Sequence, residues 1–256
     1  MKKFLFFIVL SGFLFADPIK IAMDNQYPPF EFQKGGKIVG FDVDFTNELS
    51  KRIGFEYQIV PTAYDSICNT INSGKADIGI SALGNDNSTQ DCEHGVSYFE
   101  SEYLFVKNRS RKDINDISDL KDKKVAYDRD SSAMKDFLTE IEAKPVPKKS
   151  GTMVSTLLSL YEEKVDSIVI DSCNAPIVRG KTEFLSERDL TNLNLISGGF
   201  ESFVIFHAQP ADDAETFVIF PKDGRHEDLK NRINNAILQM RNDGTIKTLL
   251  QKYGLE

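Results

Sequence analysis

The sequence contains few residues suited to acid–base or metal chemistry. Only three histidines occur in 256 residues, without metal-ligand spacing. The GxSxG, P-loop, HExxH and GxGxxG motifs are all missing. Because imidazole catalysis has so few candidates, the sequence predicts a protein that is not an enzyme and that holds no metal and no cofactor.

Cysteine is also scarce. Cys68, Cys92 and Cys173 include no CxxC pair, which argues against a zinc or redox site. Their number is odd, so at least one stays unpaired within a monomer. One disulfide can form among the three, and the sequence leaves its pairing open.

Basic residues are not concentrated in any stretch, and the formal net charge is −8. Phosphate binding needs a basic surface, so we expect no nucleic-acid partner. The composition, 41% hydrophobic and 27% charged, is that of an ordinary globular protein. The length suits one large domain or two modest ones.

The one strongly apolar run lies at the N-terminus. Lys2 and Lys3 precede an apolar stretch over residues 4–15, and Ala16 is a candidate for the last residue removed. This layout predicts a secretory signal peptide over residues 1–16; the alternative is a buried N-terminal helix. The run is too short to span a bilayer. It contains no cysteine, so we expect no lipid anchor there and a periplasmic protein.

Strand-like and helix-like segments alternate along the chain. Helical periodicity of apolar residues marks 44–54, 63–74, 131–141, 151–164, 227–240 and 243–254, whereas apolar, β-branched runs mark strands at 18–23, 55–60, 76–81, 123–128 and 165–171. Such alternation predicts an α/β fold with parallel strands.

The terminal helices have no sheet of their own. The economical interpretation is two Rossmann-like lobes, lobe one over 17–106 and 214–256 and lobe two over 107–213, with a ligand cleft between them. Two strand-like hinge segments at the boundaries, 101–111 and 214–224, would join the lobes.

Four features of the sequence are candidates for ligand binding. Tyr27 follows the first strand, where open α/β sheets place ligands, and Tyr64 stands at a helix entrance. Ser131 and Ser132 open a helix and could bind an anion through its free N–H groups. Asp171 ends a buried strand and could receive an ammonium group. The plainer alternatives are core aromatic residues, an N-cap and a turn aspartate.

Six segments together resemble the polar amino-acid solute-binding proteins of bacterial ABC importers, with the type II periplasmic-binding-protein fold. These are YPPFEF, VGFDVDFTNELSKRIG, SGKADIGIS, SDLKDKKVAY, VDSIVIDS and NDGTIKTLLQKYG. The resemblance implies an amino acid held between Tyr27 and Tyr64, with Asp24 near its side chain. It also implies that Asp171 meets the α-ammonium group and that the helix start at Ser132 meets the α-carboxylate.

One family feature is missing. The resemblance implies an arginine about five residues after the third strand, but Thr89 falls near that position and residues 84–101 contain no arginine. Arg129 could supply the charge instead. Alternatively, the ligand could lack a free carboxylate, which Asp24, Asp86 and Asp171 would suit, or transport binding could have been lost. Ser81, Ala82 and Leu83 are expected at the lobe-one rim, offering polar groups to the ligand.

The resulting prediction is the periplasmic binding component of an ABC importer. It would be a monomer that captures an amino acid or small amine by lobe closure and delivers it to a membrane permease with its ATPase. The alternatives are a ligand-presenting partner of a chemoreceptor and a periplasmic enzyme, such as a dehydratase or lytic glycosidase, on the same fold.

Overall fold

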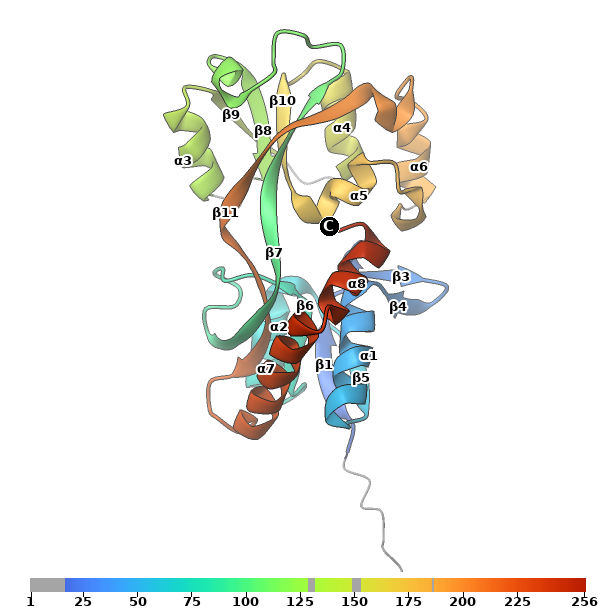
Figure 1. Ribbon diagram of the computed structural model, residues 1–256, viewed down its shortest axis with the longest axis vertical. Helices are drawn as coiled ribbons and strands as arrows, with labels where there is room; N and C mark the ends of the chain where they lie inside the picture. The colour runs from blue at the N-terminus through green and yellow to red at the C-terminus, as the bar shows by residue number, and fades with distance from the viewer. Residues whose placement is uncertain (1–16, 129–131, 149–152, 186) are drawn as a thin grey trace, which may run out of the picture.

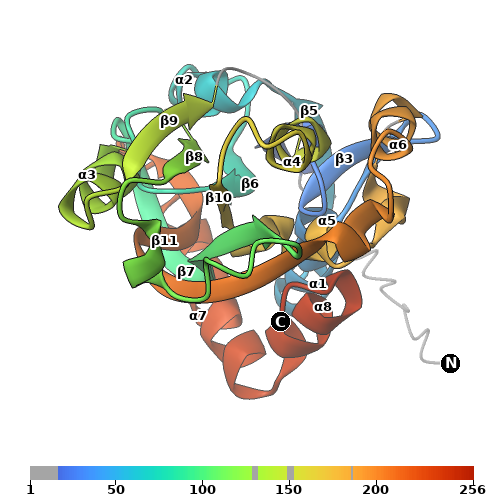
Figure 2. The same cartoon turned by 90° about the horizontal axis from the view of Figure 1, so that it is seen from above.

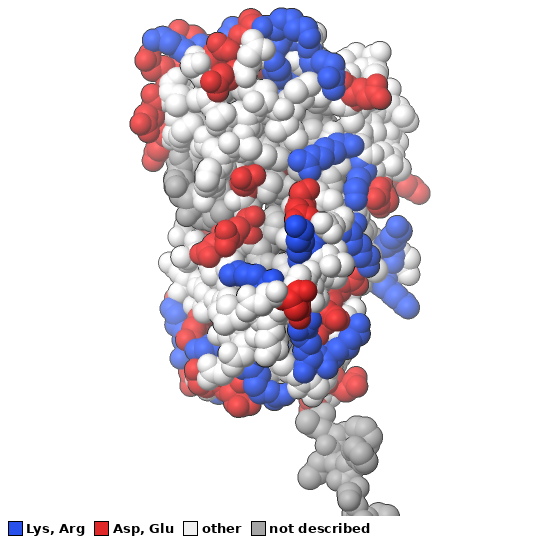
Figure 3. All heavy atoms as spheres, in the orientation of Figure 1, with Lys and Arg blue, Asp and Glu red and all other residues white. Residues whose placement is uncertain are grey.

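The structure is a computed structural model that describes residues 17–128, 132–148, 153–185 and 187–256. The predicted signal peptide, Arg129 and Ser131 lie outside the described residues. Within those ranges, no helix has both the length and the apolar character needed to cross a membrane. Acidic and basic side chains are interspersed on both halves of the face in Figure 3.

Among the described residues, eight strands form one large mixed sheet in the order β5-β1-β6-β11-β7-β10-β8-β9. The two central strands are β11 and β7. The strands on either side of them pair in parallel, as predicted, whereas β11 is antiparallel to β6 and β7 is antiparallel to β10. The strands are β1 (Ile19–Met23), β5 (Tyr57–Pro61), β6 (Ile78–Leu83), β7 (Cys92–Asn108), β8 (Lys124–Asp128), β9 (Lys144–Lys148), β10 (Ser167–Asp171) and β11 (Phe203–Pro221).

A small second sheet and the helices complete the fold. The small sheet contains β2 (Gln26–Tyr27), β3 (Glu31–Lys34) and β4 (Lys37–Val39). The helices are α1 (Phe41–Ile53), α2 (Ile67–Asn72), α3 (Ser132–Glu140), α4 (Met153–Tyr161), α5 (Ala175–Val178), α6 (Glu187–Leu193), α7 (Glu227–Asn242) and α8 (Thr245–Tyr253), with short 3₁₀ turns that include η3 (Ser172–Asn174) and η4 (Thr182–Phe184).

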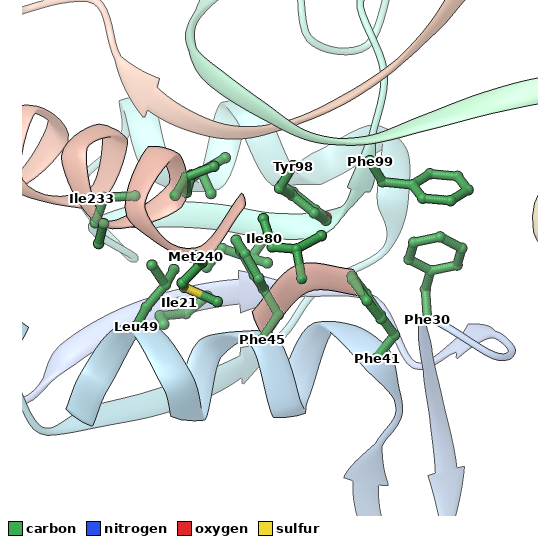
Figure 4. Close-up of a cluster of buried hydrophobic side chains, with 14 of the residues drawn as sticks. Ile21, Phe30, Phe41, Phe45, Leu49, Ile80, Tyr98, Phe99, Ile233 and Met240 are labelled. Carbon is green, nitrogen blue, oxygen red and sulfur yellow. The ribbon is translucent and has the colours of Figure 1, made fainter. Parts of the chain in front are cut away.

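Helix α1 shows how the sequence builds lobe one. Phe41, Phe45 and Leu49 recur every four residues, so they share one helix face, and all are fully buried. Figure 4 shows this face packed against β1 and α7. Gly54 ends the helix in the left-handed conformation, with its N–H donating to the Ser50 carbonyl. The helix begins three residues before the predicted position 44.

Most of the buried apolar residues form separate cores in the two lobes. Two clusters lie in lobe one, and the larger combines β1, α1 and β6 with α7 and α8, although more than a hundred residues separate these segments. Two other clusters fill lobe two. The chain therefore leaves lobe one, builds lobe two and returns, as Figure 1 shows.

Strands β7 and β11 run side by side from one lobe to the other (Figures 1 and 2). Their antiparallel pairing extends from Phe203 opposite Asn108 to Pro221 opposite Cys92. Its register shifts between Pro210 and Glu215, so the ladder is interrupted there. The predicted lobe boundaries fall within these two strands and stay a prediction.

Candidate ligand-binding site

A cavity of about 1010 Å³ lies between the two lobes. Its lobe-one wall comes from the ends of β1 and β6 and the loops that follow them, and its lobe-two wall comes from the ends of β9 and β10 and the first turns of α3 and α4. The lining residues are Asp24, Gln26, Tyr27, Glu31, Tyr64, Asp65, Ala82, Asp86, Asn87, Ser88, Tyr103, Met134, Lys148, Met153, Val169, Ile170, Asp171 and Asn174.

Asp24 organises the lobe-one wall. Its carboxylate accepts hydrogen bonds from the backbone N–H groups of Asn25 and Gln26, and, at 2.8 Å, from that of Tyr64. The carboxylate thus joins the two loops that carry Tyr27 and Tyr64. Backbone donors already occupy much of its accepting capacity, which makes Asp24 a positioning group for both tyrosines.

Tyr27 reaches across the cleft. Its residue surface is 37% exposed, but its hydroxyl end is enclosed and lies 2.8 Å from the sulfur of Cys173 in η3 of lobe two. Burial, followed by the negative potential of Cys173 and Asp171, raises the Tyr27 pKa well above its usual value. The phenol therefore stays neutral at physiological pH and contacts both lobes.

Tyr64 is fixed by the loop after β6. Its hydroxyl donates to a carboxylate oxygen of Asp86 at 2.8 Å. Burial, and then the charge of Asp86, raises the Tyr64 pKa. The second Asp86 oxygen accepts hydrogen bonds from the backbone N–H and the hydroxyl of Ser88. Tyr64 is therefore held in one position by a loop that is itself internally bonded.

Thr89 stands near the position where the resemblance implies an arginine, and it does not line the cavity. It is 1% exposed, and its hydroxyl donates to the Gly84 carbonyl at 2.7 Å. A disulfide between Cys68 and Cys92 ties the end of this loop to α2. Cys173 is the free cysteine of the three. Asp86 of this loop therefore faces the cavity, whereas Thr89 stabilises the loop from within by its hydrogen bond to Gly84.

Two carboxyl groups at the lobe-one wall, those of Glu31 and Asp42, are fully buried, and Glu31 belongs to the cavity lining. The Asp42 carboxylate accepts hydrogen bonds from the Tyr98 hydroxyl at 2.9 Å and from the Ala82 N–H at 2.7 Å. Glu31 Oε1 accepts one from the Ser81 hydroxyl at 2.7 Å. Glu31 Oε2 has no donor among the described residues.

The carboxyl groups of Glu31 and Asp42 also interact with each other. Two carboxyl groups can hydrogen-bond only when one of them is protonated, so this pair shares a proton. Burial, and then the Asp42 charge, raises the Glu31 pKa well above its usual value. Burial also raises the Asp42 pKa, to about 6. Glu31 is therefore the protonated partner and donates to Asp42. The sequence predicts no such pair, and its one signal of burial is the phenylalanine beside each carboxylate in "FEF" and "GFDVDF".

Five of the ten predicted site residues line the cavity, and two do not. Asp24, Tyr27, Tyr64, Ala82 and Asp171 belong to the lining. Ser81 and Leu83 are fully buried, because β6 is a central strand: Ser81 bonds to Glu31, and Leu83 joins a lobe-one core cluster. For their side chains, the expected rim position is therefore not observed.

Ala82 differs from its two neighbours. Its φ of 45° lies in the left-handed region, and the Asp42 carboxylate holds its N–H. The backbone N–H of Ala82 is thus already bonded, although the residue faces the cavity. Of the remaining predicted residues, Ser132 begins α3 as expected, whereas Arg129 and Ser131 are not described.

The lobe-two wall is built mainly from apolar side chains. Asp171 ends β10, where its backbone pairs with Tyr103 of β7, and Lys148 ends β9. Sites at the carboxyl ends of parallel strands are typical of open α/β sheets. The apolar lining residues, which the sequence analysis missed because their signal is simply that of a core, are Met134, Met153, Val169 and Ile170.

The fold and its inter-lobe cavity define a two-lobed binding protein. A family model, that of bacterial extracellular solute-binding proteins, family 3, matches residues 19–256. The chain belongs to this family. The predicted fold class, resemblance and binding function are thereby confirmed.

Several relatives agree with this assignment. The chain is 28% identical over 243 residues to a probable histidine-binding protein of Campylobacter jejuni, which covers 93% of this chain and 85% of that protein. It is 24% identical to the L-cystine-binding protein TcyJ of Escherichia coli, over 91% of this chain and 81% of that protein. Among solved structures, the second substrate-binding domain of a putative amino acid ABC transporter from Streptococcus pneumoniae has the same fold, with a TM-score of 0.70, 22% identity and coverage of 92% and 99% of the two chains.

Proposed function

We propose that the protein is the substrate-binding component of an ABC importer for an amino acid or a related small amine, and that it is not an enzyme. The supporting observation is the cavity of about 1010 Å³ that both lobes line. The relatives named as amino-acid-binding proteins support the ligand class.

In the proposed mechanism, lobe one receives the ligand and lobe two closes over it. The pairing of β7 and β11 is interrupted between Pro210 and Glu215, and this weakened section of the ladder is the proposed hinge. A ligand shifts the open–closed equilibrium only by its preference for the closed form. Residues that contact both lobes, such as Tyr27, therefore contribute to that preference.

The proposed ligand contacts follow from the positions of the lining residues. The rings of Tyr27 and Tyr64 offer aromatic faces, on which a cationic or planar ligand group can stack. Asp171 receives an ammonium group at the opposite wall. The N-terminus of α3 at Ser132 is a further candidate contact for an electron-rich ligand group.

The proposed compartment is the periplasm, reached through the signal peptide over residues 1–16. The Cys68–Cys92 disulfide supports an oxidising environment. In this compartment the closed form would dock on a permease with its ATPase. A chemoreceptor that recognises the same closed form is the alternative partner.

The test is to identify what the protein carries and what closes it. Ligand that co-purifies with the mature protein is released by denaturation and analysed by mass spectrometry. The stripped protein is then screened against a panel of amino acids and amines by thermal unfolding and small-angle scattering. A true ligand raises the melting temperature and lowers the scattering radius. No change in either quantity across the whole panel would overturn the proposed function.

A further inference from the structure

The described lining of the cavity is strongly acidic. It contains five carboxyl side chains, those of Asp24, Glu31, Asp65, Asp86 and Asp171, and one basic side chain, that of Lys148. Even with Glu31 neutral, four negative charges face one positive charge. In a cleft with low-dielectric walls the electric field of such charges is focused, so the acidic lining attracts cations and repels anions.

The acidic groups lie on both walls. Asp24, Asp65 and Asp86 belong to lobe one, and the described lining contains no basic residue from that lobe. Asp171 belongs to lobe two. A ligand that spans the closed cavity therefore meets a carboxylate at each end, which suits a molecule with two separated cationic nitrogen groups.

Most hydroxyl donors at or behind the lobe-one wall are already used within the protein, whereas the side-chain amides of Gln26 and Asn87 line the cavity as further donors. The hydroxyl groups of Tyr64 and Ser88 donate to Asp86, that of Ser81 donates to Glu31, and the backbone N–H of Ala82 donates to Asp42. A ligand carboxylate needs such donors, because its oxygens only accept hydrogen bonds. Apart from these two amide side chains, the described part of this wall offers mainly acceptors.

We propose that the ligand is a small dication without a free carboxylate, such as a diamine, a guanidino-amine or a carboxyl-blocked basic amino acid. This inference rests on the proposed function and narrows its ligand class. Asp86 and Asp171 receive the two cationic groups, and Tyr64, which Asp86 positions, stacks on the ligand. A free α-carboxylate in the same cavity would be repelled by Asp86 or Asp171, and among the described lining side chains Lys148 is the one positive charge that could offset this repulsion.

Matched ligand pairs test the proposal by isothermal titration calorimetry on the stripped mature protein. The pairs are agmatine with arginine, cadaverine with lysine, and argininamide with arginine. In at least one pair the carboxylate-free member should bind ten or more times more tightly than its partner. Equal or tighter binding of the free amino acid in every pair that binds would overturn this inference and leave the proposed function intact. No binding by any of these compounds would also overturn this inference, whereas the proposed function is overturned only if the wider panel of amino acids and amines fails as well.

Charge-neutralising variants supply the second arm. Asp86→Asn should weaken binding of the carboxylate-free ligand about tenfold and narrow its advantage over the amino acid. Asp65 is an exposed lining residue. The variant Asp65→Asn should weaken binding of the carboxylate-free ligand too, but less than Asp86→Asn does. The matched control is Asp91→Asn, on the same loop but exposed and outside the lining; it should leave both affinities unchanged. An unaltered preference in folded Asp86→Asn protein would contradict the proposal.

Discussion

The two walls of the cavity differ in how they are held. On the lobe-one wall, polar groups are bonded to one another: Asp24 joins two loops, Asp86 fixes Tyr64, and a buried carboxyl pair holds Ala82. On the lobe-two wall, Met134 and Met153 lie beside Val169 and Ile170, and methionine adapts its shape easily. We infer that the lobe-one wall is rigid and selects the ligand, whereas the lobe-two wall is softer and adapts to the shape of the ligand.

Such a division suits a protein that binds in two stages. A preorganised wall loses little conformational entropy when it receives a ligand, so it can select among ligands in the open state. An adaptable apolar wall can then close over ligands of somewhat different length. Substitutions in the rigid lobe-one wall, in the softer lobe-two wall and at the contact between them test this division, and they are ordered here by decreasing expected effect.

The largest effect is expected from loss of the disulfide. Replacing Cys68 and Cys92 by serine opens a covalent loop with a sequence separation of 24, which should lower the free energy of unfolding by about 3 kcal/mol. Denaturant unfolding measures the loss. Cys173→Ser is the control and should cost less than about 1 kcal/mol. An equal loss in both proteins would show that the disulfide does not brace the rigid wall.

The next effect compares a charged and an apolar residue of the soft wall. Asp171→Asn should weaken ligand binding by about 2 kcal/mol, since it removes a charge-assisted contact. Met134→Leu should change the affinity less than about threefold, because the two side chains have similar volume. Calorimetry with the identified ligand measures both. A larger loss for Met134→Leu would mean that the packing of this wall, and not its charge, determines affinity.

The buried carboxyl pair predicts a dependence of stability on pH. Both pKa values are raised in the folded state, so the folded protein retains protons that the unfolded chain has released. Stability should therefore be greatest at acidic pH, and should fall as the pH rises through about 6, the folded-state pKa of Asp42, and beyond it for Glu31.

Glu31→Gln isolates this effect, because glutamine keeps a donor toward Asp42 without a titrating proton. At pH 8 the variant should be more stable than the wild type by about 1 kcal/mol, with a shallower pH dependence. Thermal unfolding between pH 5 and pH 8 at constant ionic strength measures it. Glu56→Gln, at an exposed position, is the matched control. Parallel curves for Glu31→Gln and the wild type would contradict the shared proton.

The smallest effect concerns the contact between the walls. Tyr27→Phe removes the hydroxyl that lies 2.8 Å from the Cys173 sulfur and leaves the ring in place. Hydrogen bonds to sulfur are weak, so we expect ligand affinity to fall less than about threefold, mainly through faster dissociation. Stopped-flow release kinetics measure the change. A tenfold loss would show that the hydroxyl itself contacts the ligand.

The regular part of the fold could be predicted from the sequence because its signals are local. The spacing of Phe45, Leu49 and Ile53 predicts α1, and Gly54 predicts its end. The start of α1 was placed too late, because Phe41 follows Gly40 without an N-cap side chain and carries no start signal. Local periodicity therefore fixes which elements form better than where they begin.

The site could be predicted only in part, since it depends on contacts between distant residues. Tyr27, Tyr64 and Asp171 follow strand ends, which the chain order reveals. The pairing of Cys68 with Cys92, and the contact of Glu31 with Asp42, require segments that come together only in the folded sheet. Leu83 was expected at the rim because the register of β6 against β11 is not visible in the sequence.

Cys173 gives the protein an internal reporter of its own movement. It is the one cysteine outside the disulfide, 4% exposed, and it packs into the lobe-one core cluster from η3 of lobe two. If the lobes separate as the proposed mechanism requires, Cys173 leaves that cluster and its sulfur is uncovered. The rate at which a thiol reagent modifies Cys173 should therefore measure how often the lobes open, without any engineered probe.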